Sequence, residues 1–256
     1  MADSARLTVK IYKQQVLTGG TQPHVIGMSD GNDYVVKFKG NAQGTGVLVN
    51  EYVVNELIAR LGFEGGHGRV VVADAMFISN EPHLSTKHLQ AGPQFASPYY
   101  KNHDNFSDAF LDHLQNRAKL PQVIVLDTLI CNDDRGSGNL LLVFDDPTKR
   151  DCRFVLIDHG HAFGGPNWDE HTLKTLQGST KLFANAINLS NVPKTIDVFE
   201  PFLLKLEALS PGEIQAIIES IPADWGLHSA NRKALLDFLV VRKDKVRAVI
   251  TSQLAT

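Results

Sequence analysis

Two short polar segments, each inside a long apolar run, constrain this chain more than any other feature. The first covers residues 132–139 (Asn-Asp-Asp-Arg-Gly-Ser-Gly-Asn), and the second covers residues 158–161 (Asp-His-Gly-His). The residues on either side of both segments are mostly Leu, Ile and Val. Carboxylates and carboxamides in such a context cost desolvation energy unless a cation binds them. We therefore expect a cation site, and the residue types suit Mg²⁺ held together with a nucleoside triphosphate.

The first segment has the residue types of a phosphoryl-transfer loop. Asp134 stands before Asn139 on a stretch that follows a predicted helix and precedes a predicted strand. The aspartate can accept a hydroxyl proton, and the asparagine can hold a metal without adding charge. Asp158 comes at the end of the next predicted strand and beside a glycine, which suits a magnesium ligand. Each segment alone is also explained as a turn, but the two together favour a site.

The first 80 residues predict a small β-rich lobe with one helix. Val49, Val53 and Leu57 recur at helical spacing and Gly62 fits a helix end, so we expect a helix over 46–61. Alternating or β-branched stretches predict strands at 7–17, 25–28, 34–38, 70–73 and 75–78.

The remainder of the chain predicts a connection followed by a larger, mostly helical lobe. Pro82, Pro93 and Pro98 interrupt the pattern, so residues 81–101 are expected to connect the lobes. Within them, 91–100 is either an ordered connection or a substrate contact. The fold class is therefore α+β, with lobes at 1–80 and 102–256. Strands are expected at 140–144 and 153–157, and helices at 105–117, 121–131, 170–176, 196–207, 211–220 and 229–253, with the basic run 242–247 on a solvated helix face.

Lys37 and a glycine-bearing turn are the candidate phosphate contacts of the small lobe. A lysine within Tyr-Val-Val-Lys-Phe either extends from an edge strand to solvent or points into a cleft between lobes, where Glu51 or Glu56 of the helix could pair with it. The turn at 19–24 lies between the first two strands, where its backbone amides could cover phosphates. It contains no G-x-G-x-x-G or Walker motif, and a plain hairpin loop explains it equally well.

Composition and charge restrict the partners. The net charge of −3 gives no global basic field for nucleic acid or anionic membranes. Cys131 and Cys152 have no metal-ligand spacing. No apolar run reaches the roughly 18 residues of a membrane span, and no apolar leader precedes Lys10. We expect a cytoplasmic protein without a membrane span or a nucleic-acid partner.

Several of these segments occur together in one known family. They are Gly-Thr-Gln-Pro-His at 20–24, Tyr-Val-Val-Lys-Phe at 34–38, Val-Asn-Glu-Tyr at 49–52, residues 132–139, and Leu-Ile-Asp-His-Gly at 156–160. The set resembles the HipA-like kinases, a bacterial family whose atypical fold is related to phosphatidylinositol 3- and 4-kinases. The resemblance extends over about residues 8–165 and is weaker around 221–225.

The resemblance implies a bilobal kinase-like fold that uses ATP and Mg²⁺. Lys37 would bind the ATP phosphates and Glu51 would pair with it. Asp134 would be the catalytic aspartate. The metal ligands would be Asn139 and Asp158, and the phosphate loop would be formed by Gly19, Gly20, Thr21, Gln22 and His24.

Two departures leave the phosphate acceptor open. Gly136 stands where the family's namesake carries histidine, and His159 follows the metal-binding aspartate. His159 is expected to pack or hydrogen-bond beside the site, and the role of His161 stays open. The acceptor could be a protein Ser/Thr, the kinase itself or a small molecule. The alternatives are a pseudokinase-like nucleotide-binding module, against which the complete set of predicted catalytic residues argues, and a lipid kinase, against which the near-neutral charge argues.

Overall fold

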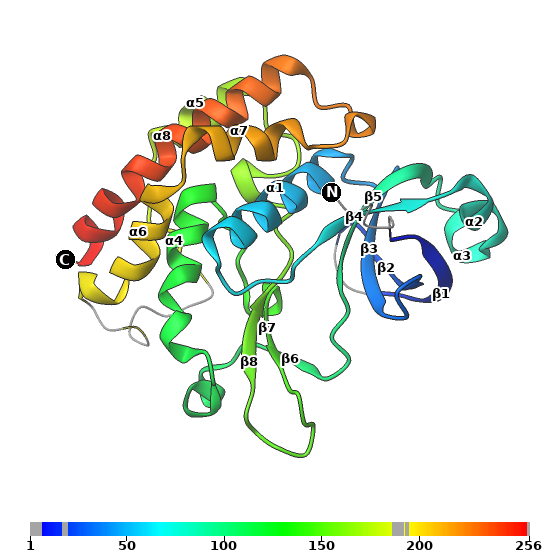
Figure 1. Ribbon diagram of the computed structural model, residues 1–256, viewed down its shortest axis with the longest axis horizontal. Helices are drawn as coiled ribbons and strands as arrows, with labels where there is room; N and C mark the ends of the chain where they lie inside the picture. Colours follow the sequence, from blue (N-terminus) through cyan, green and yellow to red (C-terminus); the bar gives the residue numbers. More distant parts are fainter. Residues whose placement is uncertain (1–6, 17–19, 186–191, 193–194, 255–256) are drawn as a thin grey trace.

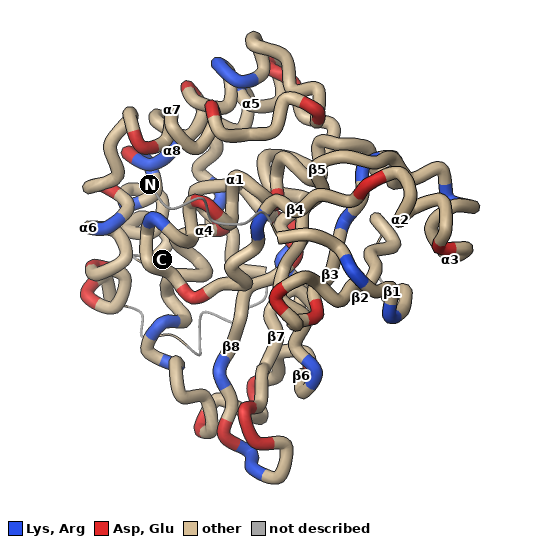
Figure 2. Tube along the Cα trace, turned by 45° about the vertical axis from the view of Figure 1, so that its right-hand side comes forward, with Lys and Arg blue, Asp and Glu red and all other residues tan. Residues whose placement is uncertain are grey.

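A curved β-sheet and a block of helices form the two ends of the molecule, with a small sheet beside their junction (Figure 1). The computed structural model describes residues 7–16, 20–185, 192 and 195–254. Acidic and basic residues are interspersed over both ends (Figure 2). No helix in the described part of the chain is long and apolar enough to cross a lipid bilayer.

The N-terminal sheet has five antiparallel strands in the order β1-β2-β3-β5-β4. A parallel bridge from Thr8 to Val72 joins the start of β1 to β4 at the far edge, so the sheet curls toward a closed barrel. The strands predicted at 7–17, 25–28, 34–38 and 70–73 are confirmed. The observed bounds are Val9–Gln15 (β1), His24–Met28 (β2), Asp33–Lys39 (β3), Arg69–Ala73 (β4) and Gln90–Pro98 (β5).

The two faces of this sheet pack against different helices. Val36 and Phe38 of β3 belong to an apolar cluster that also includes Ile78 of α2 and Leu84 of α3. Because successive strand residues alternate between faces, Lys37 points the other way, toward α1. The helix predicted at 46–61 is confirmed as α1. The helices beside the sheet are α1 (Gly46–Leu61), α2 (Ala75–Asn80) and α3 (Pro82–Ser85).

Residues 75–101 depart from the prediction. The expected strand at 75–78 is α2, because Asp74 caps a helix by accepting a hydrogen bond from the Phe77 N–H. The stretch 81–101, expected to connect the lobes, contains α3 and β5, and β5 lies inside the sheet between β3 and β4. Pro93 cannot donate a hydrogen bond to a neighbouring strand, so its presence argued against an internal strand at this position.

The C-terminal part combines a three-stranded sheet with helices. The expected helix at 105–117 is instead the end of β6 and two 3₁₀ turns, because the backbone at His113 and Gln115 bonds to Cys152 across a parallel bridge. The other predicted helices and strands are confirmed, although 3₁₀ turn η6 precedes α6. The elements are β6 (His103–Asn105), η1 (Asp108–His113), η2 (Arg117–Lys119), α4 (Pro121–Ile130), η3 (Ser137–Asn139), β7 (Leu140–Val143), β8 (Arg153–Leu156), η4 (Ala162–Gly164), α5 (Glu170–Gln177), η6 (Ile196–Val198), α6 (Glu200–Ala208), α7 (Pro211–Glu219), η7 (Ala223–Trp225) and α8 (Ser229–Leu254).

Helix α1 lies between the N-terminal sheet and the helical block (Figure 1). Twelve of its sixteen residues are buried, so it is enclosed on nearly every side. Its polar residues Asn50, Glu51 and Asn55 are among them, and buried polar groups need partners. The site described below is built around those partners.

The basic run 242–247 of α8 is a solvated face only in part, because Asp244 and Lys245 are exposed whereas the two arginines bond to neighbouring elements. Arg242 is fully buried and donates to the backbone carbonyls of Ser179 and Thr128. Arg247 pairs with Glu200 and Glu207 of α6. These cations therefore attach α8 to its neighbours, because acceptors on α4 and α6 lie opposite them.

Candidate active site

Three charged side chains from separate elements meet beside α1. Lys37 of β3 bonds to Glu51 of α1, and its Nζ lies 2.7 Å from Oδ1 of Asp158, which follows β8. Glu51 also accepts a hydrogen bond of 3.0 Å from the backbone N–H of His159. The structure thus selects Glu51 over the half-buried Glu56, for which no ion pair occurs among the described residues.

The exposure of these three side chains differs. Those of Lys37 and Glu51 are 8% and 3% exposed, whereas that of Asp158 is 35% exposed. Asp158 is therefore the member that a ligand can reach. Its φ of 52° is a left-handed value that is uncommon for a residue other than glycine, and such strain is typical of functional positions.

Lys37 stabilises the charged forms of both carboxylates of this triad. Burial lowers the pKa of Lys37, but Glu51 and Asp158 outweigh it and raise the pKa overall. Burial raises the pKa of Asp158, but the neighbouring Lys37 outweighs it and holds the pKa well below its usual range. Burial also raises the pKa of Glu51, against the opposing effect of Lys37. An ammonium and an accessible carboxylate thus stand side by side, as anionic phosphates with a cation require.

The second part of the site is the loop after α4. Asp134 is exposed, and Asn139 folds back on it. The Asn139 Nδ2 donates to the Asp134 carbonyl at 2.8 Å and lies 3.4 Å from its carboxylate. The amide oxygen of Asn139 therefore remains able to accept or to bind a cation. The structure brings Asp134 and Asn139 together as predicted.

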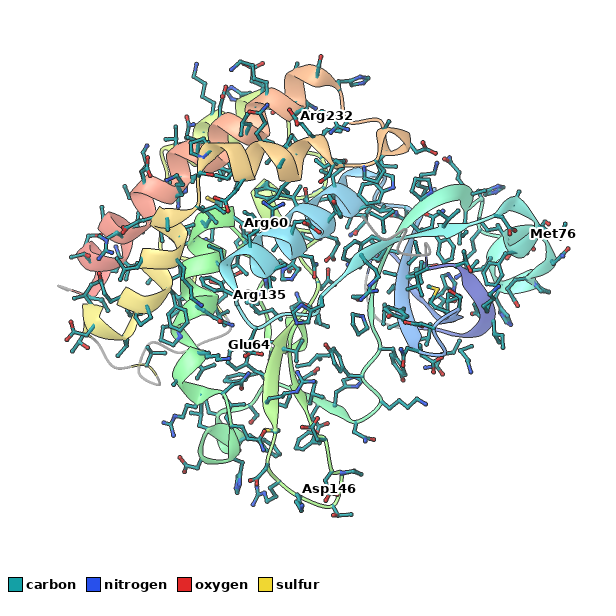
Figure 3. The ribbon with its side chains drawn as sticks, in the orientation of Figure 1. Arg60, Glu64, Met76, Arg135, Asp146 and Arg232 are labelled. Atoms are coloured by element: carbon teal, nitrogen blue, oxygen red, sulfur yellow. The ribbon has the colours of Figure 1, made fainter. Side chains whose placement is uncertain are left out.

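Arg135 connects this loop to the loop that carries Asp158. Its guanidinium, 1% exposed, makes a two-pronged contact with Asp127 of α4, at 3.1 Å from Nε and 3.0 Å from Nη2. It also donates to the carbonyls of Asn139 and Ile157 at 2.9 and 2.6 Å. In Figure 3, Arg135 lies at the centre of the molecule, where α1, α4 and the β7–β8 hairpin meet. It therefore fixes both loops and does not face solvent.

His159 completes this network, as expected for a residue beside the site. Its Nδ1 lies 2.9 Å from Nη2 of Arg135. Burial, with the nearby Arg135 charge, holds its pKa well below the usual range, so the ring is neutral and Nδ1 accepts the hydrogen bond. Asp127 was not predicted to belong to the site. Its signal was a carboxylate inside the apolar helix 121–131.

Asn50 was missed as well, although it precedes Glu51 directly. Its Nδ2 lies within hydrogen-bonding distance of the carbonyls of Gly160, Ala162 and Gly165, at 2.8, 3.0 and 3.1 Å. Its Oδ1 accepts a 2.7 Å bond from the indole of Trp168. Asn50 therefore attaches α1 to the chain that follows Asp158. An asparagine at a buried helical position was the available signal.

The predicted phosphate turn lies apart from the triad. Gly19 is outside the described residues. Thr21 and Gln22 lie near Lys87, whose Nζ is 3.0 Å from the Gln22 amide oxygen. His24 pairs with Val36 on β3, so its ring faces away from Lys37. Gly20 packs against Gln43, where a side chain would collide with the amide. In the described residues, no hydrogen bond joins this turn to the triad.

Two further segments have defined places. His161 is half-buried, and its side chain makes no hydrogen bond, ion pair or aromatic contact among the described residues. Residues 91–100 belong largely to β5, where the Pro93 carbonyl accepts a 2.9 Å bond from Trp225. That segment is an ordered part of the N-terminal sheet.

The donor set fits a divalent cation that is bound mainly by its substrate. The described residues contain no group of three or more His, Cys, Asp or Glu placed to hold a metal. Asp158 and Asn139 offer a carboxylate and a carboxamide oxygen. Mg²⁺ commonly uses one or two protein carboxylates and completes its shell with water and phosphate oxygens. This set therefore suits a cation that arrives with phosphate oxygens among its ligands.

Comparisons with known proteins agree on the fold. The chain matches the family described as "HipA-like kinase" over residues 9–251. No curated protein matches its sequence. The crystal structure of a Helicobacter pylori proinflammatory kinase, CtkA, is similar with a TM-score of 0.62 and 14% identity, over 95% of this chain and 94% of that chain.

The Golgi casein kinase is similar as well. One structure has a TM-score of 0.54 at 14% identity, covering 97% of this chain and 74% of that chain. Another, with Mn/ADP bound, has a TM-score of 0.51 at 14% identity, covering 96% and 72%. At these identities the likeness shows a shared fold.

Proposed function

The chain belongs to the HipA-like kinase family, and from that premise we propose that it transfers the γ-phosphate of ATP, with Mg²⁺, to a hydroxyl group. The acceptor is a protein Ser/Thr or the kinase itself. The observation that carries this proposal is the meeting of Lys37, Glu51 and Asp158 from β3, α1 and the end of β8. Residues this far apart in sequence converge on a buried ammonium with one accessible carboxylate.

The proposal gives each residue a task. Lys37, fixed by Glu51, binds the phosphates as a positive charge. Asp134 accepts the proton of the attacking hydroxyl, since it is exposed and has Asn139 beside it. Asn139 and Asp158 hold the metal, which neutralises charge on the phosphates when bound. Catalysis of this kind consists mainly of positioning and charge stabilisation.

The lobes contribute separately to this arrangement. We place the lobe boundary after β5, near residue 99, because β5 is an internal strand of the first sheet. Lys37 and Glu51 then come from the small lobe, and Asp134, Asn139 and Asp158 from the large one. The nucleotide would lie between them, with the turn at 20–24 as a candidate phosphate cover.

A nucleotide-binding module without transfer activity is the alternative. A pure binder has no use for an exposed aspartate with an asparagine folded onto it, whereas a phosphotransferase requires a proton acceptor near the hydroxyl. The geometry at Asp134 and Asn139 therefore favours transfer.

Substitution of Asp134 tests the proposal. Asp134→Asn should lower phosphate transfer from labelled ATP by about 10²–10⁴-fold, the usual contribution of a general base, while Mg-ATP still raises the melting temperature. Asp158→Asn should lose both transfer and the Mg-dependent part of that increase. Asp146→Asn, at the tip of the β7–β8 hairpin far from Arg135 (Figure 3), is the matched control. Wild-type turnover in Asp134→Asn would contradict the proposal.

A further inference from the structure

A pocket of about 240 Å³ lies at one end of the N-terminal sheet, apart from the triad. Three segments line it: Thr21, Gln22 and His24 on one side, residues 40–42 after β3, and Lys87 with Leu89 between α3 and β5. Its volume is below the roughly 300–1,000 Å³ of pockets for drug-sized ligands. Such a volume suits a small ion.

The ring of His24 supplies a buried polar atom without a partner. The residue is 1% exposed, and its Nδ1 lies 3.4 Å from the Tyr12 hydroxyl. Its Nε2 is buried and has no hydrogen-bond partner among the residues that the structure describes. Phe38 contacts the ring edge-on. Leaving a buried polar atom unpaired costs about 1–3 kcal/mol, and a ligand in the pocket is the available partner.

Lys87 supplies a positive charge that no acid neutralises. Its Nζ lies 2.7 Å from the amide oxygen of Gln15 and 3.0 Å from that of Gln22. No carboxylate lies within ion-pairing distance of it in the described part of the chain. Burial and the nearby Lys87 and His83 lower the pKa of His24 to about 4. The ring is therefore neutral, and either nitrogen can carry the hydrogen that an anion would accept.

We propose that this pocket is a second ligand site, which binds a small oxyanion of the size of inorganic phosphate between Lys87 and His24. The ammonium supplies the charge, the imidazole Nε2 supplies a buried donor, and the Thr21 hydroxyl lies on the same wall. Charge-assisted hydrogen bonds are the strong contacts in such sites. The proposal does not depend on the assignment of the catalytic residues.

Occupancy of this site would act on the turn that forms its wall. Thr21 and Gln22 belong to both the pocket and the candidate phosphate cover. An anion that bonds to this wall stabilises one position of the turn, because a ligand favours the conformation to which it binds more tightly. The concentration of a small anion would therefore influence the conformation of this turn in the small lobe.

Calorimetric titration with inorganic phosphate tests the site. The wild-type protein, shown by intact mass to carry no covalent phosphate, should bind one phosphate. Lys37→Met should bind it equally well, which separates this site from the nucleotide site. Lys87→Met should weaken binding by about tenfold or more, the effect of losing one charge-assisted contact. Lys149→Met removes the same charge from an exposed position and should leave binding unchanged.

A second measurement identifies the ring. In ¹⁵N spectra that detect histidine rings, Nε2 of His24 should shift on addition of phosphate or sulfate, and this shift should be absent in Lys87→Met. The proposal is overturned if phosphate does not bind, if Lys87→Met binds like the wild type, or if Lys37→Met abolishes binding. His24→Phe should also weaken binding, and Lys87→Met carries the test if that variant does not fold.

Discussion

At the scale of single residues, Arg135 holds together the two loops of the candidate site. The residue follows the proposed catalytic aspartate, yet its guanidinium turns inward, to Asp127, His159 and two backbone carbonyls. A buried ion pair adds little net stability by itself. The Arg135 guanidinium fixes the positions of three segments relative to one another, because one rigid planar group bonds simultaneously to α4, the 134–139 loop and the chain before Asp158.

Removal of this guanidinium should be costly. Arg135→Met would leave Asp127 buried without its cation, for which we expect a loss of about 3–5 kcal/mol in the free energy of unfolding. Urea denaturation of the variant measures this loss. The double variant Asp127→Leu/Arg135→Met should recover part of it, since no unpaired charge then remains. A change below about 1 kcal/mol, the range of exposed ion pairs, would show that the network does not hold the loops.

The residues that the structure brings together at the candidate site include those whose chemistry is unusual for their sequence context. Lys37 lies in an apolar strand and Asp158 at the end of another. A charged side chain in such a context costs desolvation energy, so its presence indicates a functional position. The partners of Asn50 lie more than a hundred residues away, and nothing in its local sequence indicates them. The choice between Glu51 and Glu56 also depended on which face of α1 the sheet covers, which is a tertiary property.

At the scale of elements, the start of α1 is fitted closely against the chain after Asp158. A Cβ on Gly46 would come within 1.8 Å of the Pro166 carbonyl, and one on Gly160 within 2.4 Å of a Val47 methyl group. Neither glycine has a positive φ, so close approach is the reason for both. This fit brings Glu51 to the His159 N–H.

Gly160→Ala should therefore separate these two elements. Overpacking of this kind costs about 1–3 kcal/mol, and the displacement should also lower kcat, because Glu51 and Asp158 lie on opposite sides of the contact. The double variant Gly160→Ala/Val47→Ala should recover much of the lost stability and kcat. A Cβ in Gly46→Ala would instead meet the Pro166 backbone carbonyl, so truncating a side chain cannot relieve that collision. Gly178→Ala, which meets only ordinary contact distances, is the control. Equal losses in Gly160→Ala and Gly160→Ala/Val47→Ala would refute the packing argument.

Element prediction failed at β5 for a physical reason. Its prolines indicate a linker, but the Gln94 side chain supplies hydrogen bonds where the β3–β5 pairing shifts register between Lys37 and Lys39. Gln94 accepts from the Lys39 N–H at 2.6 Å and donates to the carbonyls of Gln90 and Gly92. Side-chain substitution for a strand hydrogen bond has no sequence signature. Helix α1, by contrast, had a clear sequence signature in its regular apolar spacing and the glycine at its end.

At the scale of the whole molecule, the C-terminal helices reach back to the first sheet. The 3₁₀ turn η7 between α7 and α8 places Trp225, 2% exposed, against Tyr52 of α1 and the Pro93 carbonyl of β5. Beside it, Asp224 lies 3.6 Å from Lys39 of β3. This contact joins the C-terminal helices to α1 and the first sheet, so we infer that it limits how far the small lobe can turn.

Loss of this contact should uncouple the lobes. Trp225→Ala should lower the free energy of unfolding by about 3–5 kcal/mol, as expected for a large buried side chain, and the N-terminal sheet should lose most of this stability. In hydrogen exchange followed by mass spectrometry, peptides from β3 and β5 should lose protection at lower urea than those from α4 and α8, whereas in the wild type both should follow one transition. Trp225→Phe keeps the aromatic packing but not the bond to Pro93, so it should retain a single transition with a smaller loss. If Trp225→Ala also unfolds in one step, the lobes are joined by the burial of α1 alone, and the turn at 223–225 is not their coupling.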